Sequence, residues 1–360
     1  MAESMQAGQS NGFQALQVIA KVRESDTITS FHLRPQDASG WRNFEAGQFL
    51  VFQIPNPLGD EGPYHHIVRN YSVSSSPNEV GSYRITVKRE ASNQAGVAHG
   101  LGSSYLHDHV QVGDVLMADG PRGQFVLNCN SSRPVVFLSG GVGLTPLVSM
   151  LHAVVSQGDR RAVFVHACKN GSVHALGDEV RSLAASCNQV SLHFVYRHPT
   201  AADIVAARHH SDGLITREML QAHFPLAECD FYLCGPPAFM KSMYTLVRSL
   251  GVAEDRIAYE FFGPATVLAE SNTTENGFAV TFQKSGLGAT WTPSAHSLLA
   301  FAEGLGLSPE FSCRAGVCGT CRTGLLQGKV SYFEEPLDEV GDQHVLLCCA
   351  RPVGPLVLDL

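Results

Sequence analysis

The sequence is poor in charge and has no excess of basic residues. Only 16% of its 360 residues are charged, and 33 acidic side chains against 25 basic ones give a formal net charge of −8. A nucleic-acid-binding protein needs clustered Lys and Arg to neutralise phosphates, so this composition argues against that class. A hydrophobic fraction of 44% is too high for a disordered chain. At about 100 to 200 residues per domain, the length predicts two or three folded domains.

The first residues lack the apolar core of a secretion signal, because Met1 to Gln14 is polar and rich in Gly and Ser. Half of the ten cysteines fall close to the carboxyl end, at Cys313, Cys318, Cys321, Cys348 and Cys349. This clustering does not suit a disulfide framework spread over a secreted protein. We therefore expect a cytoplasmic protein whose clustered cysteines bind metal.

Charge is missing altogether between Pro134 and Gly158, a stretch of 25 residues that is long enough to span a bilayer. Three glycines and a proline interrupt it within Gly140 to Pro146. These interruptions predict a buried strand, a loop and a helix, so we expect neither a membrane span nor a membrane partner.

Hydrophobic periodicity divides the chain into three domains. Residues 15–130 show short alternating runs between turn residues, typical of an antiparallel β-barrel. Residues 131–264 alternate apolar strands with helical segments, which indicates an α/β domain with a parallel sheet. The polar residues 265–277 predict a linker, and residues 278–360 a third domain of about ferredoxin size. Residues 1–14 are expected to be disordered.

The cysteine motif carries the most specific signal. Cys313-x4-Cys318-x2-Cys321 followed by a distant cysteine is the spacing of plant-type [2Fe-2S] ligands. A structural zinc site would more usually show two Cys-x2-Cys pairs, and the motif contains one. Two adjacent residues, Cys348 and Cys349, are candidates for the fourth ligand.

The tetrapeptide Arg69-Asn70-Tyr71-Ser72 ends a candidate barrel strand and suits a flavin. It offers a guanidinium for phosphate, an aromatic ring for the isoalloxazine and a hydroxyl for the reactive N5. The same residue types also occur on ordinary surface strands. The segment Gly102 to Asp108 supports the flavin interpretation, because it begins a helix whose backbone amides can bind pyrophosphate.

A glycine-rich loop, Gly140 to Pro146, follows an apolar strand and predicts a dinucleotide site, because glycines let a pyrophosphate approach the backbone. Pro146 stands where the third glycine of Gly-x-Gly-x-x-Gly would be, so the standard Rossmann fingerprint is not met. Cys234 ends another strand of this domain. There it could approach a nicotinamide or serve as a small buried hydrophobe.

Together these motifs resemble the flavohaemoglobin-type reductase module of the ferredoxin-NADP reductase superfamily, followed by a plant-type ferredoxin of β-grasp (α+β) fold. The plan is also similar to hybrid-cluster-protein reductases and to the reductase components of Rieske oxygenases. The globin of flavohaemoglobins has no counterpart in this sequence. The likeness of residues 345–352 to the ferredoxin ending selects Cys348 as the fourth iron ligand and leaves Cys349 as a packing residue.

The resemblance also implies a set of site residues. The flavin would be bound by Arg69, Asn70, Tyr71, Ser72, Val87, Ser103 and Phe262. The nucleotide would be bound by Gly141, Gly143, Thr145, Cys234 and Pro236. Ser72, Cys234 and Glu260 would be catalytic, and Cys313, Cys318, Cys321 and Cys348 would hold the cluster. The segments 88–90 and 106–108 resemble members that use FAD, and FMN is the less favoured flavin.

The function implied is an NADH-dependent reductase. Hydride would pass from NAD(P)H to the flavin, and single electrons through the [2Fe-2S] cluster to a separate terminal oxygenase or hybrid-cluster-type acceptor. Two alternatives stay open: a self-contained oxidoreductase acting on a small molecule such as nitric oxide, and a non-enzymatic redox sensor. Lys169 or Arg197 could accept a 2′-phosphate, so NADPH also stays open. An acidic stretch at 334–342 is either a solvated face or a docking patch for a basic partner. The sequence predicts no oligomeric state.

Overall fold

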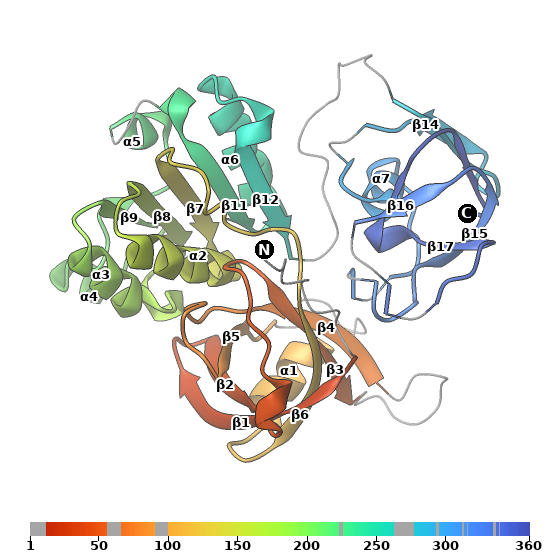
Figure 1. The fold of residues 1–360 in the computed structure, drawn as a ribbon. Helices are drawn as coiled ribbons and strands as arrows, with labels where there is room; N and C mark the ends of the chain where they lie inside the picture. Colours follow the sequence, from red (N-terminus) through yellow and green to blue (C-terminus); the bar gives the residue numbers. More distant parts are fainter. Residues whose placement is uncertain are drawn as a thin grey trace, which may run out of the picture.

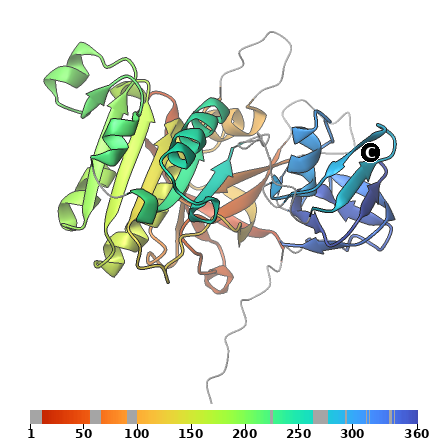
Figure 2. The same cartoon turned by 90° about the horizontal axis from the view of Figure 1, so that it is seen from above.

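The computed structural model describes residues 12–55, 66–90, 100–222, 226–262, 277–292, 295–311, 313–314, 316–333, 336–337 and 339–360. Figures 1 and 2 show three units, each built around its own β-sheet. Most of the expected disordered N-terminus and of the expected linker lies outside the described residues. Within those ranges, no helix is both long and apolar enough to cross a bilayer.

The first unit is an antiparallel sheet with the strand order β4-β3-β6-β1-β2-β5. Its elements are β1 (Gln14–Arg23), β2 (Ile28–Pro35), β3 (Phe49–Pro55), β4 (His66–Ser72), β5 (Tyr83–Lys88), α1 (Leu101–Asp108) and β6 (Val115–Arg122), with a 3-10 turn, η1, at Ala38–Gly40. A bridge between Val73 and Ile85 brings the two edge strands, β4 and β5, together. The sheet therefore closes on itself, which confirms the predicted barrel.

The second unit is a parallel sheet with the order β10-β9-β8-β7-β11-β12. Its strands are β7 (Val135–Gly140), β8 (Ala162–Cys168), β9 (Val190–Tyr196), β10 (Ser211–Asp212), β11 (Asp230–Gly235) and β12 (Ile257–Phe261). Its helices are α2 (Leu144–Gln157), α3 (Gly177–Ser186), α4 (Ala201–Val205), α5 (Arg217–Gln221) and α6 (Pro237–Ser249). The strand order reverses on either side of β7, and ligands of such sheets bind outside the carboxyl ends at that point.

The charge-free stretch folds as expected. It forms β7, the 3-10 turn η2 (Gly141–Gly143) and α2 in succession. Every residue of β7 is buried, because the strand lies at the centre of the sheet between β8 and β11. Its apolar character therefore comes from burial on both faces of a sheet.

The third unit is a mixed sheet with the order β14-β13-β19-β15-β17 and a separate pair, β16-β18. Its elements are β13 (Ala279–Phe282), β14 (Leu287–Thr290), α7 (Leu298–Gly304), β15 (Arg322–Gln327), β16 (Val330–Tyr332), β17 (His344–Leu346), the 3-10 turn η7 (Leu347–Cys349), β18 (Ala350–Pro352) and β19 (Leu356–Leu358). Buried residues of α7 pack into one core with Phe282 and Trp291. This is the α+β, β-grasp domain that the resemblance implied.

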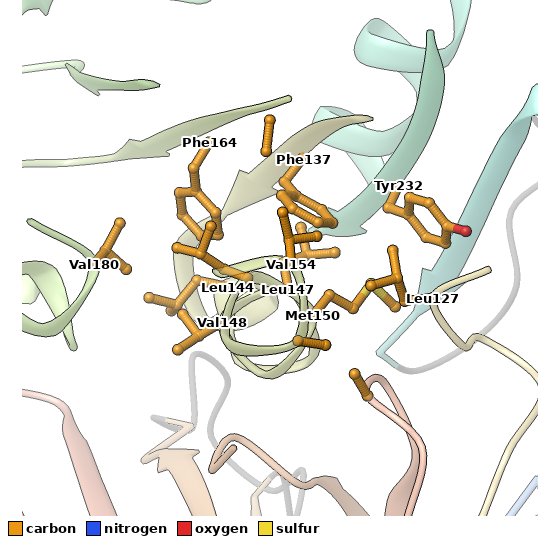
Figure 3. Packing of buried hydrophobic residues seen from close by; sticks show 14 of the residues in the cluster. Leu127, Phe137, Leu144, Leu147, Val148, Met150, Val154, Phe164, Val180 and Tyr232 are labelled. Carbon is orange, nitrogen blue, oxygen red and sulfur yellow. The ribbon is translucent and has the colours of Figure 1, made fainter. Parts of the chain in front are cut away.

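Helix α2 lies where the barrel meets the parallel sheet (Figure 3). Its apolar residues, among them Leu147 and Val154, pack beneath Phe137 and Phe164 of β7 and β8. The barrel unit adds Ile28, Ala46, Phe125 and Leu127 to the same hydrophobic cluster. The approach is tight: a Cβ built on Gly47 would lie 2.5 Å from Met150 Cε. One continuous core therefore joins the barrel and the parallel sheet.

Truncation of this shared core should be costly. Leu147→Ala removes a fully buried side chain, and we expect it to lower the free energy of unfolding by about 2–5 kcal/mol through lost burial and a residual cavity. Leu214→Ala is the control, because Leu214 is 66% exposed, and its effect should stay within about 0.5 kcal/mol. Urea unfolding followed by circular dichroism measures both, and equal shifts in the two variants would contradict the shared core.

Candidate functional site

The barrel and the parallel sheet meet at a serine and a glutamate. Ser72 ends β4, and its hydroxyl donates to Glu260 Oε2 on β12 over 3.5 Å. Glu260 pairs in register with Cys234 of β11, which in turn pairs with Ser139 of β7. The predicted flavin strand thus faces the carboxyl ends of the strands around which the sheet order reverses.

The Glu260 carboxyl is half-buried at this junction. Burial raises its pKa to about 8, and the hydrogen bond from Ser72 opposes this shift only in part. At neutral pH the group therefore carries its proton. Oε2 of Glu260 and Oγ of Ser72 are consequently placed to hold or exchange a proton at the junction of the two units.

Cys234 is fully buried, and its side chain belongs to the hydrophobic cluster around α2. Burial, followed by the nearby Glu260, raises the pKa of its thiol well above the ordinary value, so the thiol stays neutral. The structure places the residue at the predicted strand end. Its side chain faces the core, as the alternative of a small buried hydrophobe expected.

The glycine loop packs closely onto β11. A Cβ built on Gly143 would lie 2.3 Å from the Cys234 carbonyl oxygen, so only glycine fits there. Gly141 has a φ of +55°, and a Cβ built on it would meet nothing within 4 Å. Thr145, in the first turn of α2, is buried and donates to the Val142 carbonyl over 3.1 Å. The loop therefore combines a rigid base with an open side at Gly141.

The first turn of α1 lies against the side chains of β4. A Cβ built on Gly102 would lie 2.9 Å from Arg69 Cγ and 3.2 Å from Tyr71 Oη. Ser103 donates to the Gly100 carbonyl over 3.0 Å and accepts from the Glu90 N–H over 3.1 Å. The helix start, Arg69 and Tyr71 therefore lie close together.

Four predicted residues have less specific surroundings. Asn70 is half-buried on β4, and Pro236 is exposed just before α6. The Val87 side chain is buried in the barrel core, and its carbonyl oxygen lies 2.9 Å from His107 Nε2. Phe262 is 39% exposed, two residues after Glu260. Only backbone atoms of Val87 remain as candidates for a cofactor contact.

The cysteine loop directs backbone amides at the thiols. The N–H groups of Val317 and Cys318 donate to Cys313 Sγ, both over 3.3 Å. The Cys313 N–H donates to Cys318 Sγ over 3.4 Å, and the Gly316 N–H to Cys348 Sγ over 3.3 Å. Such donors stabilise thiolates, which are the form that binds iron.

The surroundings of Cys349 differ from those of Cys348. Cys349 is fully buried and its Sγ faces the Leu346 carbonyl over 3.7 Å. A Cβ built on Gly316, whose φ is +71°, would lie 3.0 Å from Cys349 Sγ. The loop glycine therefore rests on Cys349, while the same glycine's N–H points to Cys348 Sγ. These contacts support Cys348 as the ligand.

The cysteine loop packs on the barrel, a contact that sequence reasoning missed. Cys313 and Val317 share a hydrophobic cluster with Phe49 and Val51 of β3, and Figures 1 and 2 show the third unit beside the barrel. Phe49 pairs in register with Ser72. Gln124 also donates to the Phe333 carbonyl across the two units. The apolar Val317 within the motif was the available signal, but no pattern named its partner.

The chain's residues fit the three groups that the sequence predicts. The open side at Gly141 suits a phosphate, the α1 turn with Arg69 and Tyr71 suits a flavin, and the amide-lined thiols suit an iron–sulfur cluster. Within the described ranges, no group of three or more His, Cys, Asp or Glu side chains is arranged around a single ion position. When bound, the nicotinamide and flavin supply two-electron chemistry and the cluster one-electron chemistry.

Three family models match the chain in the order of its units. They are the oxidoreductase FAD-binding domain over residues 15–127, the oxidoreductase NAD-binding domain over residues 137–245, and the 2Fe-2S iron-sulfur cluster binding domain over residues 282–353. The flavohem-like FAD/NAD-binding domain of nitric oxide dioxygenase from Vibrio cholerae superposes with a TM-score of 0.62. It is 32% identical, and the match covers 70% of this chain and 100% of that chain.

The chain belongs to the flavohaemoglobin-type reductases of the ferredoxin-NADP reductase superfamily. The flavohemoproteins of Bacillus cereus and Bacillus subtilis are 43% and 40% identical over 257 and 267 residues. These matches span 71% and 74% of this chain but only 62% and 63% of those relatives.

Phthalate dioxygenase reductase aligns with all three units of this superfamily member. The alignment covers 97% of this chain and 98% of that one, at a TM-score of 0.57 and 24% identity, and it shows a common fold. The domain matches establish an NAD(P)H-dependent oxidoreductase with FAD and a [2Fe-2S] cluster. FAD is thus the flavin, as the sequence favoured.

The raised pKa of Glu260 should make stability depend on pH. Between its ordinary pKa of 4.5 and the folded value of about 8, the folded chain holds a proton that the unfolded chain has released, so stability falls as pH rises through this window. In Glu260→Gln this loss of stability is absent, because glutamine does not ionise. By pH 8 the melting midpoint of the variant should therefore be higher by several degrees, relative to the native chain, than at pH 5, since 1 kcal/mol shifts such domains by about 2–4 °C.

Calorimetry from pH 5 to 9, at matched flavin content, checks the expectation. The difference between the two midpoints should grow up to pH 8 and then level off. A difference that does not change with pH would mean that Glu260 is ionised in the folded chain.

Proposed function

We propose that this chain is the reductase component of a two-protein system, taking electrons from NADH and passing them singly to a separate redox protein. A terminal oxygenase or a hybrid-cluster-type protein is the acceptor that this architecture suits. The single observation that carries the proposal is the packing of the cysteine loop on the flavin barrel. Cys313 and Val317 share a hydrophobic cluster with Phe49, whose register partner is Ser72.

This neighbourhood supports an electron path inside one molecule. Electron transfer needs carriers held close together, and the apolar contact excludes water between the loop and β3. Ser72 lies one strand away from the loop and also contacts Glu260 beside the nucleotide sheet. In this proposal, electrons pass from nucleotide to flavin to cluster along a path that runs by Ser72.

The predicted site residues take specific roles in this proposal. Arg69 and Tyr71 hold the flavin beside the α1 turn, and Gly141 admits the dinucleotide phosphates. Ser72 and the neutral Glu260 hold a proton where the barrel meets the sheet. Cys234 shapes the base of the nicotinamide site through its backbone, which contacts Gly143.

NADH is the proposed donor because the Asp203 carboxylate lies near Cys168, the last residue of β8. Asp203 Oδ2 accepts from the Gly171 N–H over 3.3 Å and from the Thr200 N–H over 2.8 Å. Burial alone would raise the pKa of Asp203, but the hydrogen bonds from Thr200 and Gly171 lower it, so the group stays anionic. An anion near the end of the second strand of such a sheet favours ribose hydroxyls and disfavours a 2′-phosphate.

A second candidate is the oxidation of nitric oxide, which the likeness to the Vibrio cholerae domain favours. In that case the chain would supply electrons to a haem-containing acceptor. Turnover of nitric oxide by this chain alone with NADH would favour a self-contained enzyme over both two-protein schemes.

The electron path predicts unequal effects of two neighbouring cysteines. Cys348→Ser removes a proposed iron ligand, and NADH-driven reduction of cytochrome c should fall at least about tenfold because the one-electron carrier is lost. Cys349→Ser is the matched control, since its buried thiol contacts Leu346 and Gly316 instead. Reduction of ferricyanide, which reaches the flavin directly, should persist in both variants.

Equal cytochrome c reduction by the Cys348 variant and the native chain would contradict a path through the cluster.

NADH should support faster turnover than NADPH in the same assay. Native protein that turns over no one-electron acceptor, but binds a partner differently when oxidised and reduced, would point to the redox sensor instead.

A further inference from the structure

A buried arginine links the barrel to the nucleotide sheet. Arg84 lies on β5 and is only 9% exposed. Its guanidinium forms a two-pronged ion pair with Glu179 on α3, with Nη1 to Oε2 at 2.6 Å and Nη2 to Oε1 at 2.7 Å. The two residues belong to different units and are 95 positions apart. Neither residue was assigned a role by the sequence motifs.

On the barrel side, Arg84 holds the segment that follows the proposed flavin strand. Its Nε donates to Ser74 Oγ over 3.0 Å, and its Nη2 to the Ser74 carbonyl over 2.5 Å. The Ser74 N–H donates to the Arg84 carbonyl over 2.7 Å. Ser74 Oγ also lies 2.8 Å from Thr86 Oγ1, inside the barrel. Because Ser74 is two residues after Ser72, Arg84 fixes the backbone next to the Ser72–Glu260 contact.

On the nucleotide side, Glu179 connects Arg84 to the glycine loop. Its Oε1 also accepts from His152 Nε2 over 2.6 Å, and His152 lies on α2. Helix α2 continues directly from η2, and η2 contacts β5. Burial alone would raise the pKa of Glu179, but hydrogen bonds and charge from His152 and Arg84 lower it to about 2. Glu179 is therefore ionised throughout the neutral range.

The ion pair adds a directional constraint to the apolar interface. The core around α2 holds barrel and sheet together, but apolar burial has no preferred direction and permits small rotations. A two-pronged guanidinium–carboxylate pair is directional and fixes both distance and orientation. The pair also satisfies a buried charge that would be costly to leave unpaired. It lies across the same junction as Ser72 and Glu260.

We propose that Arg84 and Glu179 are positioning residues for the nucleotide half-reaction: their pair sets the orientation of the flavin strand relative to the glycine loop. Neither side chain needs to touch flavin or nucleotide for this role. The inference rests on NAD(P)H-dependent flavin reduction, and it is independent of which acceptor takes the electrons.

Two adjacent carboxylates on α3 allow a matched test. Glu179→Gln breaks the inter-unit ion pair, while Asp178→Asn removes the same charge from the same helix turn, where the Asp178 side chain is 81% exposed and pairs with Arg181 of its own helix over 3.0 Å. Anaerobic stopped-flow mixing with NADH measures the limiting rate of flavin bleaching and the half-saturating NADH concentration.

We expect Glu179→Gln to lower the limiting rate by about 10- to 100-fold, the cost of a misplacement near 1 Å. Half-saturating NADH should change much less, because the loop itself is intact. Asp178→Asn should stay within about twofold of the native rate.

Hydrogen–deuterium exchange supplies a readout that does not depend on turnover. Glu179→Gln should raise exchange in both 72–86 and 177–186, since the pair holds both segments. Asp178→Asn should leave 72–86 unchanged. Arg84→Lys, which keeps the charge but loses the two-pronged geometry, should reproduce the Glu179→Gln pattern in milder form.

If Glu179→Gln loses its flavin, the limiting rate is measured in Glu179→Asp instead, because this variant keeps the charge and only shortens the side chain. A slowed limiting rate in that variant, with full flavin content, supports the proposal. A native limiting rate in any flavin-loaded Arg84 or Glu179 variant overturns it. The assay stops at the flavin, so failure of the proposed acceptor reaction would leave this result unaffected.

Discussion

Burial of helix α2 on two sides is the interaction on which the rest of the site depends. One side packs on Phe137 and Phe164 of the parallel sheet, and the other on barrel residues such as Ala46 and Phe125. The helix begins at the glycine loop, so its position also sets that of the loop. If α2 moved relative to the barrel, the 3.5 Å contact between Ser72 and Glu260 could not persist. The apolar core thereby brings the two halves of the site together.

Polar groups at this junction show how partners decide the charge of a buried acid. Glu260 has one hydroxyl partner, and burial raises its pKa to about 8. Glu179 is also partly buried, yet Arg84 and His152 bring its pKa to about 2. Desolvation acts in the same direction on both carboxyls, and only Glu179 has a cation to offset it. The neutral acid can hold a proton beside Ser72, while the anionic acid is suited to a structural link.

In the third unit, one loop both supports the cysteine thiols and packs on the barrel. Backbone amides of Gly316, Val317 and Cys318 point at the thiols, and the loop they form rests on β3 of the barrel. The conformation that supports the thiolates therefore also places the loop against β3, the strand that pairs with β4. An ion pair between the Arg314 guanidinium and the Glu303 carboxylate links the loop to α7. Cluster binding and docking onto the barrel are thus properties of one loop conformation.

Much of the fold and part of the site follow from local sequence patterns. Alternating runs predict the barrel, and the change of period at about residue 131 predicts the parallel sheet, because burial on one or two faces leaves its own periodicity. The spacing of Cys313, Cys318 and Cys321 predicts a cluster, since one loop supplies three of its ligands. Gly141 and Gly143 predict a tight phosphate loop for the same local reason.

Tertiary structure decided what depends on distant partners. Ser72 and Glu260 are 188 residues apart and Arg84 and Glu179 are 95 apart, so no periodicity could pair them. Arg84 could be noticed as a charge within a buried strand, but its partner lies on another domain. Cys234 stands at the predicted strand end, yet packing turned its thiol into the core. Sequence by itself determined the elements and the local motifs, whereas burial and long-range contact determined which side chains meet and which are charged.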